Sequence, residues 1–401
     1  MSTPPKLPRL FAAQGPSLTA HRDAFGELPA VGSGLIALLD EAGLTGRGGA
    51  GFPTAVKMAA INGSRPVVVG NGAEGEPLSR KDAQLLTRAP HLVFDGLDAA
   101  AAAINADKVY LYIHPDAVPT ATAALEERRT AGLDSHRIAV VEAPDRFVAG
   151  EESAAIRHIE GGPALPRDRT VLAAVSGVKG RPTLLNNVET LAHVALIARY
   201  GPQWFRAVGE AADPGTMLIT LSGALNRHGV VEVPTGTLFG GLLEGPGGTD
   251  PRTVPAVLVG GYHGSWLAAG DLAGMRLSRP GMKSLGASPG AGIVHALGMG
   301  ECGLARTAEI TRYLADQSAL QCGPCLNGLP RLADQLEQLA HGRADDQLVH
   351  EIRRMVRLVD GRGSCRHPDG TARMVRSALR TFAADVEMHH QKRCTAAESA
   401  A

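Results

Sequence analysis

The sequence predicts an α/β unit with a mostly parallel sheet, followed by a small β-rich region and a C-terminal helical bundle. Three observations support this. Short apolar strands alternate with helical segments over residues 31–205, strands and tight turns dominate residues 206–285, and helical periodicity returns over residues 300–392. Residues 1–30 form a Pro-rich lead-in, and residues 393–401 form a tail.

The individual elements follow from local patterns. Leucines at helical spacing precede residue 40, and the next expected strands and helices are 67–69, 92–106, 108–113, 117–128 and 138–141. Residues 161–182 are rich in Gly and Pro and too long for an ordinary connection, which indicates a functional loop. A further helix begins after Asn187, and the expected C-terminal helices are 305–318, 329–341, 346–359 and 371–388.

Composition excludes several classes of function. Lys plus Arg and Asp plus Glu both number 40, which argues against a general nucleic-acid binder. No apolar run approaches the roughly 18 residues of a membrane span, and the N-terminus lacks the pattern of a signal peptide. We therefore expect a cytoplasmic protein, with peripheral docking to a membrane complex left open. Five cysteines in such a compartment favour metal or redox chemistry over a disulfide framework.

The strongest local motif is the glycine-rich stretch GRGGAGFPT at residues 46–54. Its glycines free the backbone for positive φ and for close approach to a ligand, while its arginine adds a forked cation. A short helix follows, with Lys57 one turn in. A glycine loop that leads into a helix N-terminus presents N–H groups to an anion such as a phosphate. The candidate residues of this loop are Gly46, Arg47, Gly48, Gly49 and Gly51.

Three further loops carry amides and carboxylates. A flavin offers a phosphate, a polyhydroxylated chain and a ring edge, and it therefore needs a backbone nest, side-chain amides and a few acceptors. The polar residues of these loops are Asn71, Glu74 and Glu76 after the first strand, Gly150, Glu151 and Glu152 in the sequence GEES, and the pair Asn186 and Asn187.

Together, GRGGAGFPT with Lys57, NGAEGEP, GEES and SGVKGRPTLLNNVETLA resemble the FMN-carrying, NADH-oxidising subunit of respiratory complex I. Equivalent subunits occur in NAD-dependent hydrogenases and formate dehydrogenases. The resemblance covers about residues 30–390. It implies an α/β flavin domain, a β-grasp-like middle domain and a C-terminal four-helix domain with one [4Fe-4S] cluster.

The resemblance also implies cofactors and partners. FMN accepts a hydride from NAD(H), and electrons leave one at a time through the cluster to a redox partner subunit, ferredoxin-like or similar to the 24 kDa subunit of complex I. No side chain is needed as an acid or base. The matching residues are the glycine loop and Lys57 for the phosphate, Asn71, Glu74, Asn186 and Asn187 for the ribityl chain and ring, and Glu76, Glu152 and Phe52 for NADH.

Several positions depart from the family pattern around the flavin and NADH. Ala73 stands where the family has an aspartate, and the loss of one neutral hydrogen bond costs about 0.5–1.5 kcal/mol. Ala60 and Leu172 stand where it often has aromatic residues that stack on the adenine. Losing two stacked partners weakens NADH binding by about 1–3 kcal/mol.

The cysteine pattern departs as well. Cys322, Cys325 and Cys365 match three cluster ligands, whereas Ala319 replaces the first cysteine. The three thiolates suit a [3Fe-4S] cluster or a [4Fe-4S] cluster with another fourth ligand, and a relic of a cluster site is also open. Cys302 is expected about 25 Å away, beyond an intervening helix.

Other interpretations of the cysteines stay open. The CxxC pair could bind zinc with a histidine such as His367. Cys394 lies in the polar tail and is expected to have no role. Two alternatives to the NADH-oxidising function also remain: a non-catalytic paralogue that serves as an assembly or binding module, and an FMN protein served by another donor such as a reduced ferredoxin.

Overall fold

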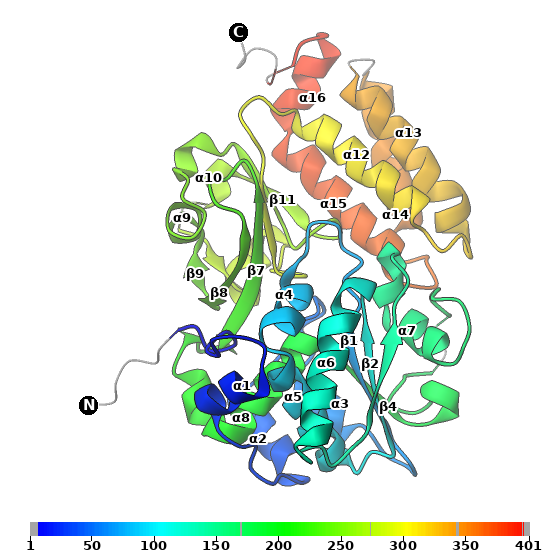
Figure 1. The fold of residues 1–401 in the computed structure, drawn as a ribbon. Coiled ribbons are helices and arrows are strands. Elements are labelled where there is room, and N and C mark those ends of the chain that lie inside the picture. The colour runs from blue at the N-terminus through cyan, green and yellow to red at the C-terminus, as the bar shows by residue number, and fades with distance from the viewer. Residues whose placement is uncertain (1–6, 169–170, 273, 342–344, 395, 397–401) are drawn as a thin grey trace. The chain divides into compact units, whose positions relative to one another are not determined.

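The computed structural model describes residues 7–168, 171–272, 274–341, 345–394 and 396 (Figure 1). The chain divides into two compact units. The first contains Met1–Ile219 and Val230–Thr237, and the second contains Thr220–Gly229 and Leu238–Ala401. The expected limits of three separate domains remain a prediction.

The first unit is built on a four-stranded parallel sheet with the strand order β3-β2-β1-β4, which confirms the expected α/β class. The short strands β5 (Gly209–Glu210) and β6 (Asp213–Pro214) pair with each other. The strands of the main sheet are β1 (Val67–Gly72), β2 (Lys108–Ile113), β3 (Ile138–Glu142) and β4 (Thr183–Asn187). The helices of this unit are α1 (Leu18–Phe25), α2 (Gly34–Ala42), α3 (Thr54–Ala59), α4 (Lys81–Arg88), α5 (Pro90–Ile104), α6 (Val118–Thr130), α7 (Glu152–Ile159) and α8 (Val188–Arg206).

Both faces of this sheet are buried. Val68 belongs to the larger core, which α5 and α8 complete, whereas Val67 and Val69 face a smaller core that includes α7. This alternation is the two-residue period of a strand. Helices α5 and α8 approach each other closely at Gly96, where a Cβ atom would lie 1.9 Å from the carbonyl oxygen of Leu191. Only glycine fits at that crossing.

The strand order creates a topological switch point. From β1 the chain moves to β2 and β3 on one side and returns to β4 on the other side of β1. At the carboxyl ends of the two adjacent strands, Gly70 pairs with Asn186 and Asn71 with Asn187. Open parallel sheets bind ligands at such a point, because the loops on either side diverge and leave a crevice.

A mixed sheet follows along the chain, with the strand order β11-β10-β13-β7-β8. Strand β13 runs parallel to β7, while β10 is antiparallel to both of its neighbours. The β-grasp-like layout expected for this part remains a prediction. The elements are β7 (Thr216–Gly223), β8 (Gly229–Pro234), β9 (Thr237–Leu238), α9 (Phe239–Glu244), β10 (Ala256–Val259), β11 (Ser265–Ala268), α10 (Ala269–Leu272), β12 (Arg276–Leu277), α11 (Arg279–Met282) and β13 (Ile293–Ala296).

The C-terminal helices pack as a bundle (Figure 1). They are α12 (Gly303–Asp316), α13 (Leu329–Ala340), α14 (Asp346–Val359), α15 (His367–Thr381) and α16 (Ala383–His390). The single helix expected over 371–388 is in fact two, divided at Phe382, whose φ of −104° and ψ of 31° leave the helical range. The buried Phe382 ring packs against Trp266 at 5.2 Å, and this contact fixes the break.

None of the helices in the described part of the chain is both long enough and apolar enough to cross a membrane.

Candidate functional site

The glycine loop lies beside the switch point of the parallel sheet. The Gly46 N–H donates to the Phe52 carbonyl at 2.9 Å and closes the loop. Gly49 and Gly51 have φ values of 111° and 63°, which side chains rarely adopt. Gly48 packs against the end of β4, because a Cβ atom there would lie 3.1 Å from the Asn187 Cβ. The loop therefore borders the strand end that carries the amide pair.

Arg47 differs from the expected anion ligand, because its guanidinium is buried within the protein. It donates to Asp213 at 3.2 Å and to the Pro214 carbonyl at 2.9 Å. The Arg47 N–H also donates to the Thr190 hydroxyl at 2.8 Å. Arg47 thus ties the glycine loop to α8 and to β6, which positions the loop.

Lys57 reaches the other side of the same region. Its ammonium donates to Glu152 at 2.9 Å and to the Leu185 carbonyl of β4 at 2.6 Å. Both side chains of the ion pair are about a quarter exposed, so the pair is open to solvent or to a ligand. Lys57 and Glu152, matched separately to the phosphate and to NADH, are therefore direct partners.

The loops after β1 and β3 pack backbone against backbone. The Asn71 amide donates to the Gly150 carbonyl at 2.9 Å, and its oxygen accepts from the Ala73 N–H at 3.1 Å. A Cβ atom at Gly150 would lie 2.6 Å from the Ala73 carbonyl oxygen, and one at Gly75 would lie 2.5 Å from that of Arg146. Gly150 therefore serves close packing between the loops.

Two of the predicted carboxylates cap helices. Glu74 accepts from the Ser79 hydroxyl and from the N–H groups of Asp82 and Ala83 at 3.1 Å, at the start of α4. Burial, with the charge of Asp82, raises the pKa of Glu74. Glu151 accepts from the first N–H groups of α7. Glu76 accepts from the Leu78 N–H at 3.4 Å within its own loop.

A buried charge network lies under the loops, and the sequence patterns missed it. Lys81 contacts Asp82 at 2.6 Å and Glu189 at 3.0 Å, and it donates to Asn187 at 3.2 Å. Asn187 in turn donates to Asp82 at 2.7 Å and caps α8. Burial opposes the charge on Lys81, yet these carboxylates hold the pKa of Lys81 above its usual range. Burial raises the pKa of Glu189.

Asn186 differs from the other two loop amides, Asn71 and Asn187, which donate hydrogen bonds within the protein. Its Nδ2 is buried without a hydrogen-bond partner, although the side chain lies at the switch point. Thr54 Oγ1, one turn before Lys57 on α3, is likewise buried and unpartnered. Buried polar groups normally have partners, so an unpaired donor at a strand end indicates a group supplied by a ligand. The site thus fits FMN, which has phosphate and hydroxyl oxygens to accept from these donors.

The apolar candidates for adenine packing lie at the surface. Phe52 is 54% exposed and Leu172 is 73% exposed, and Ala60 is also exposed. Phe52 thus presents an exposed aromatic ring on which an adenine could stack, whereas Ala60 and Leu172 have no aromatic ring.

The second unit gathers the three matched cysteines. Cys325 is buried among Ala315, Leu329 and Ala333, and Cys322 packs against this group. Burial raises the pKa of Cys325 to about 12, and the neighbouring thiols of Cys322 and Cys365 add to the shift. Three thiols in one apolar setting fit an iron–sulfur centre, but Ala319 supplies no fourth ligand.

The structure argues against zinc held with His367. Its Nε2 lies 2.7 Å from the Leu314 carbonyl and its Nδ1 lies 3.1 Å from His263 Nε2. Both ring nitrogens are thus engaged. Cys302 and Cys394 lie with His389 in a separate group, a placement that the sequence did not predict.

Comparison with known proteins places these features in context. Residues 39–196 match the family model of the Nuo51 FMN-binding domain. Residues 305–389 match that of the NADH-ubiquinone oxidoreductase-F iron-sulfur binding region.

Similar proteins extend over most of the chain. An F-type subunit of the NADH-quinone oxidoreductase of Rhizobium meliloti (strain 1021) is 31% identical over 95% of this chain and 94% of its own length. The NADP-reducing hydrogenase subunit HndC of Solidesulfovibrio fructosivorans is 28% identical over 90% and 77%. A solved NAD+-reducing [NiFe]-hydrogenase in the H2-reduced state matches with a TM-score of 0.82 and 31% identity. That match covers 88% of this chain and 62% of the hydrogenase chain.

Proposed function

We propose a division of roles among the residues of this chain, which belongs to the family of F-type subunits of NADH-quinone oxidoreductase. The chain is an NADH-oxidising electron-transfer subunit with an FMN-binding domain and an iron–sulfur region. When bound, FMN would supply the chemistry of hydride acceptance and one-electron release. The role proposed for the residues of the site is to bind, orient and shield the flavin.

The flavin site is proposed at the switch point between β1 and β4. The observation that carries this assignment is the buried, unpartnered Nδ2 of Asn186 between loops that internal hydrogen bonds hold in place. We assign Asn186 and the N–H groups of the glycine loop to FMN, and Lys57 to its phosphate. The role proposed for Arg47, Glu74 and Asn187 is indirect, because their side chains hold the loops and helix ends in place.

Glu152 is proposed to lie on the NADH side of the site. Its partner Lys57 neutralises its charge at 2.9 Å, so an anionic dinucleotide meets an ion pair instead of an isolated carboxylate. Phe52 is proposed to pack on the adenine. The absence of aromatic side chains at Ala60 and Leu172 predicts weak NADH binding.

We propose that the centre held by Cys322, Cys325 and Cys365 is a [3Fe-4S] cluster or a [4Fe-4S] cluster with a non-cysteine ligand. Replacing Ala319 with cysteine tests this. If the parent holds [3Fe-4S], the variant should gain iron and a cubane-type electron paramagnetic resonance signal after reduction; if the parent holds [4Fe-4S], the variant should keep its iron content and change only its signal. Identical iron content and spectra in both proteins would show that position 319 does not face the centre.

The acceptor is proposed to be a partner subunit with its own redox centre. The support is that the relatives are themselves subunits, of NADH-quinone oxidoreductases and of a hydrogenase. Co-purification with a tagged chain, followed by identification of iron-containing partners, tests this proposal. Recovery of the chain alone, with FMN fully reducible by NADH, would contradict it.

The first experiment is an anaerobic visible spectrum of the purified full chain before and after NADH, with iron analysis of the same sample. Flavin absorbance that NADH bleaches supports the assignment. Flavin that responds to dithionite but not to NADH supports another electron donor. A colourless protein that FMN cannot reconstitute supports a non-catalytic assembly role and refutes the proposed site.

A further inference from the structure

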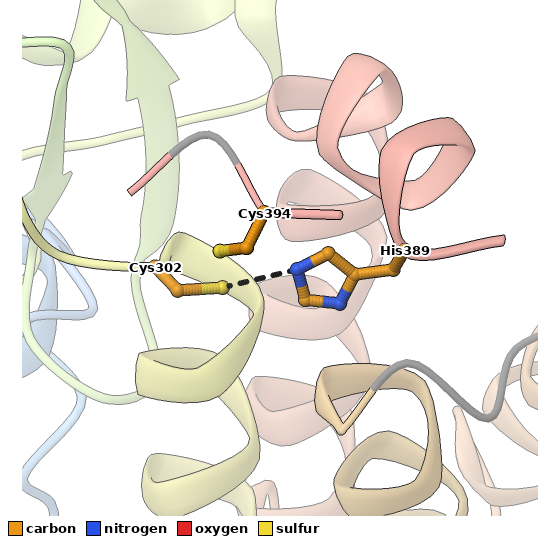
Figure 2. Close-up of side chains that lie close together, drawn as sticks. All are labelled: Cys302, His389 and Cys394. Atoms are coloured by element: carbon orange, nitrogen blue, oxygen red, sulfur yellow. Dashed lines mark hydrogen bonds between the residues drawn. The ribbon is translucent and has the colours of Figure 1, made fainter. Parts of the chain in front are cut away.

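Three potential metal ligands meet in the helical part of the second unit, apart from the three cysteines of the iron–sulfur region. Cys302 precedes α12, His389 lies in the last turn of α16, and Cys394 follows that helix. Their ligand atoms all lie within 4.8 Å of one another, although Cys302 and His389 are 87 positions apart in the sequence (Figure 2). Figure 2 shows the two sulfurs close together and the imidazole of His389 facing the sulfur of Cys302.

The hydrogen bonding of His389 fixes its tautomer. Its Nδ1 lies 2.9 Å from the Leu339 carbonyl, which can only accept, so Nδ1 carries the proton. The Nε2 lone pair then faces Cys302 Sγ at 3.5 Å. A histidine that binds a metal through one nitrogen typically donates its other N–H to a carbonyl or carboxylate. The buried ring of His389 already has this arrangement.

The distance between Cys302 and His389 agrees with tetrahedral zinc. With Zn–S bonds of about 2.3 Å and Zn–N bonds of about 2.0–2.1 Å, a tetrahedral site places sulfur about 3.6 Å from the imidazole nitrogen and the two sulfurs about 3.8 Å apart. The observed Cys302–His389 distance is 3.5 Å. Cys302 Sγ also accepts from the Ala305 N–H at 3.4 Å, in the first turn of α12.

We propose that Cys302, His389 and Cys394 bind one zinc ion, with water or another small ligand in the fourth position. Two thiolates and one imidazole form a donor set that suits this cation. On binding, both thiols release their protons to solvent, and the imidazole coordinates through Nε2 while it keeps its Nδ1 proton. Cys302 and Cys394 are partly exposed, which gives the ion a path of entry.

The expected consequence is structural. The ion joins the segment after α16 to the first turn of α12, so it closes a long loop of the chain and stabilises the folded state by mass action. This site is independent of the proposed flavin function. It shares no ligand with Cys322, Cys325 and Cys365.

The test uses the full chain with Cys322, Cys325 and Cys365 replaced by serine, which removes the iron–sulfur thiols. Titration with Co²⁺ under anaerobic conditions should give a sulfur-to-cobalt charge-transfer band that saturates at about one ion per chain, and Zn²⁺ should displace the cobalt. Cys394→Ser in this background should weaken binding by about 100-fold or more, since even an outer-shell change costs 10–100-fold. Should the background variant not fold, zinc content of the unaltered chain is compared with that of Cys394→Ser.

His389→Gln should weaken binding similarly, and His390→Gln is its matched control. The neighbouring His390 faces Asp346 and Glu387 at 3.9 Å, so its loss should leave the band unchanged. Equal cobalt affinity in the parent and in Cys394→Ser would overturn the proposal. A Cys302–Cys394 disulfide in protein purified without reductant, with no zinc bound after reduction, would overturn it as well.

Discussion

Replacing Asn186 with alanine should separate ligand binding from folding. In the ligand-free protein the buried Nδ2 of Asn186 has no partner, and an unsatisfied buried donor costs about 1–3 kcal/mol. Removing it relieves that cost while some packing is lost. We therefore expect the free energy of unfolding of the ligand-free protein to change by less than about 1 kcal/mol.

FMN affinity should respond differently. If Asn186 donates to FMN, its loss removes one hydrogen bond worth about 0.5–1.5 kcal/mol, which corresponds to about a 2- to 13-fold rise in Kd. The assay is flavin fluorescence quenching on titration of the ligand-free protein, paired with urea unfolding of the same sample.

Asn187→Ala is the matched control, because this neighbouring amide is fully used inside the protein. It bonds to Asp82 at 2.7 Å and caps α8 through the Glu189 N–H at 3.1 Å. Its loss should lower the free energy of unfolding by about 2–4 kcal/mol. The reasoning fails if Asn186→Ala destabilises the ligand-free protein as much as Asn187→Ala does and leaves FMN affinity unchanged.

The remaining predictions concern three charged groups. Lys57→Ala should raise the Kd for FMN by about 10- to 150-fold, since a hydrogen bond to a charged group contributes about 1.5–3 kcal/mol. Its ion-pair partner provides the control, because Glu152→Gln should retain FMN. Equal flavin content in Lys57→Ala and in the parent would refute the assignment of this region to the FMN phosphate. Arg47→Ala should cost about 3–5 kcal/mol in urea unfolding, because it removes the positive charge 3.2 Å from the buried Asp213 carboxylate, and a loss under about 1 kcal/mol would contradict this. Burial opposes ionisation of Asp95, but the His21 hydrogen bond and two arginines hold its pKa well below the usual range, so its stabilisation is complete above about pH 5 and is lost as pH falls. Asp95→Asn should flatten this acid-side loss in pH-dependent unfolding, and an unchanged slope would refute the assignment.

The local patterns were sufficient to predict β1, β2 and β3 of the parallel sheet, but they missed β4, which lies between the glycine- and proline-rich stretch and α8. The run KVYLYI predicted a strand at 108–113, and β2 has these limits. Apolar runs between helices specify such strands because both faces of the sheet are buried. The break at Phe382 was not predictable, since it depends on a contact with Trp266 from a distant strand.

Residue roles within the loops were harder to predict than the loops themselves. A glycine-flanked arginine is typical of an anion ligand, but Arg47 pairs with Asp213, 166 positions later. No local sequence pattern indicates a partner so far along the chain. The same holds for Lys81, which becomes a buried ion-pair partner of Glu189 only because α4 and α8 meet beneath the switch point.

These long-range pairs bear on how the site works. Arg47, Glu74 and Asn187 make hydrogen bonds within the protein, so the loops hold their positions before any ligand arrives. Binding to such a preorganised site loses little conformational entropy, and the affinity lost with Ala73 is partly offset. The Nδ2 of Asn186 differs from the amides of Asn71 and Asn187, because it has no hydrogen-bond partner within the protein and a ligand can accept from it. FMN is therefore expected to stabilise the first unit as well as to bind there, in proportion to its concentration over its Kd.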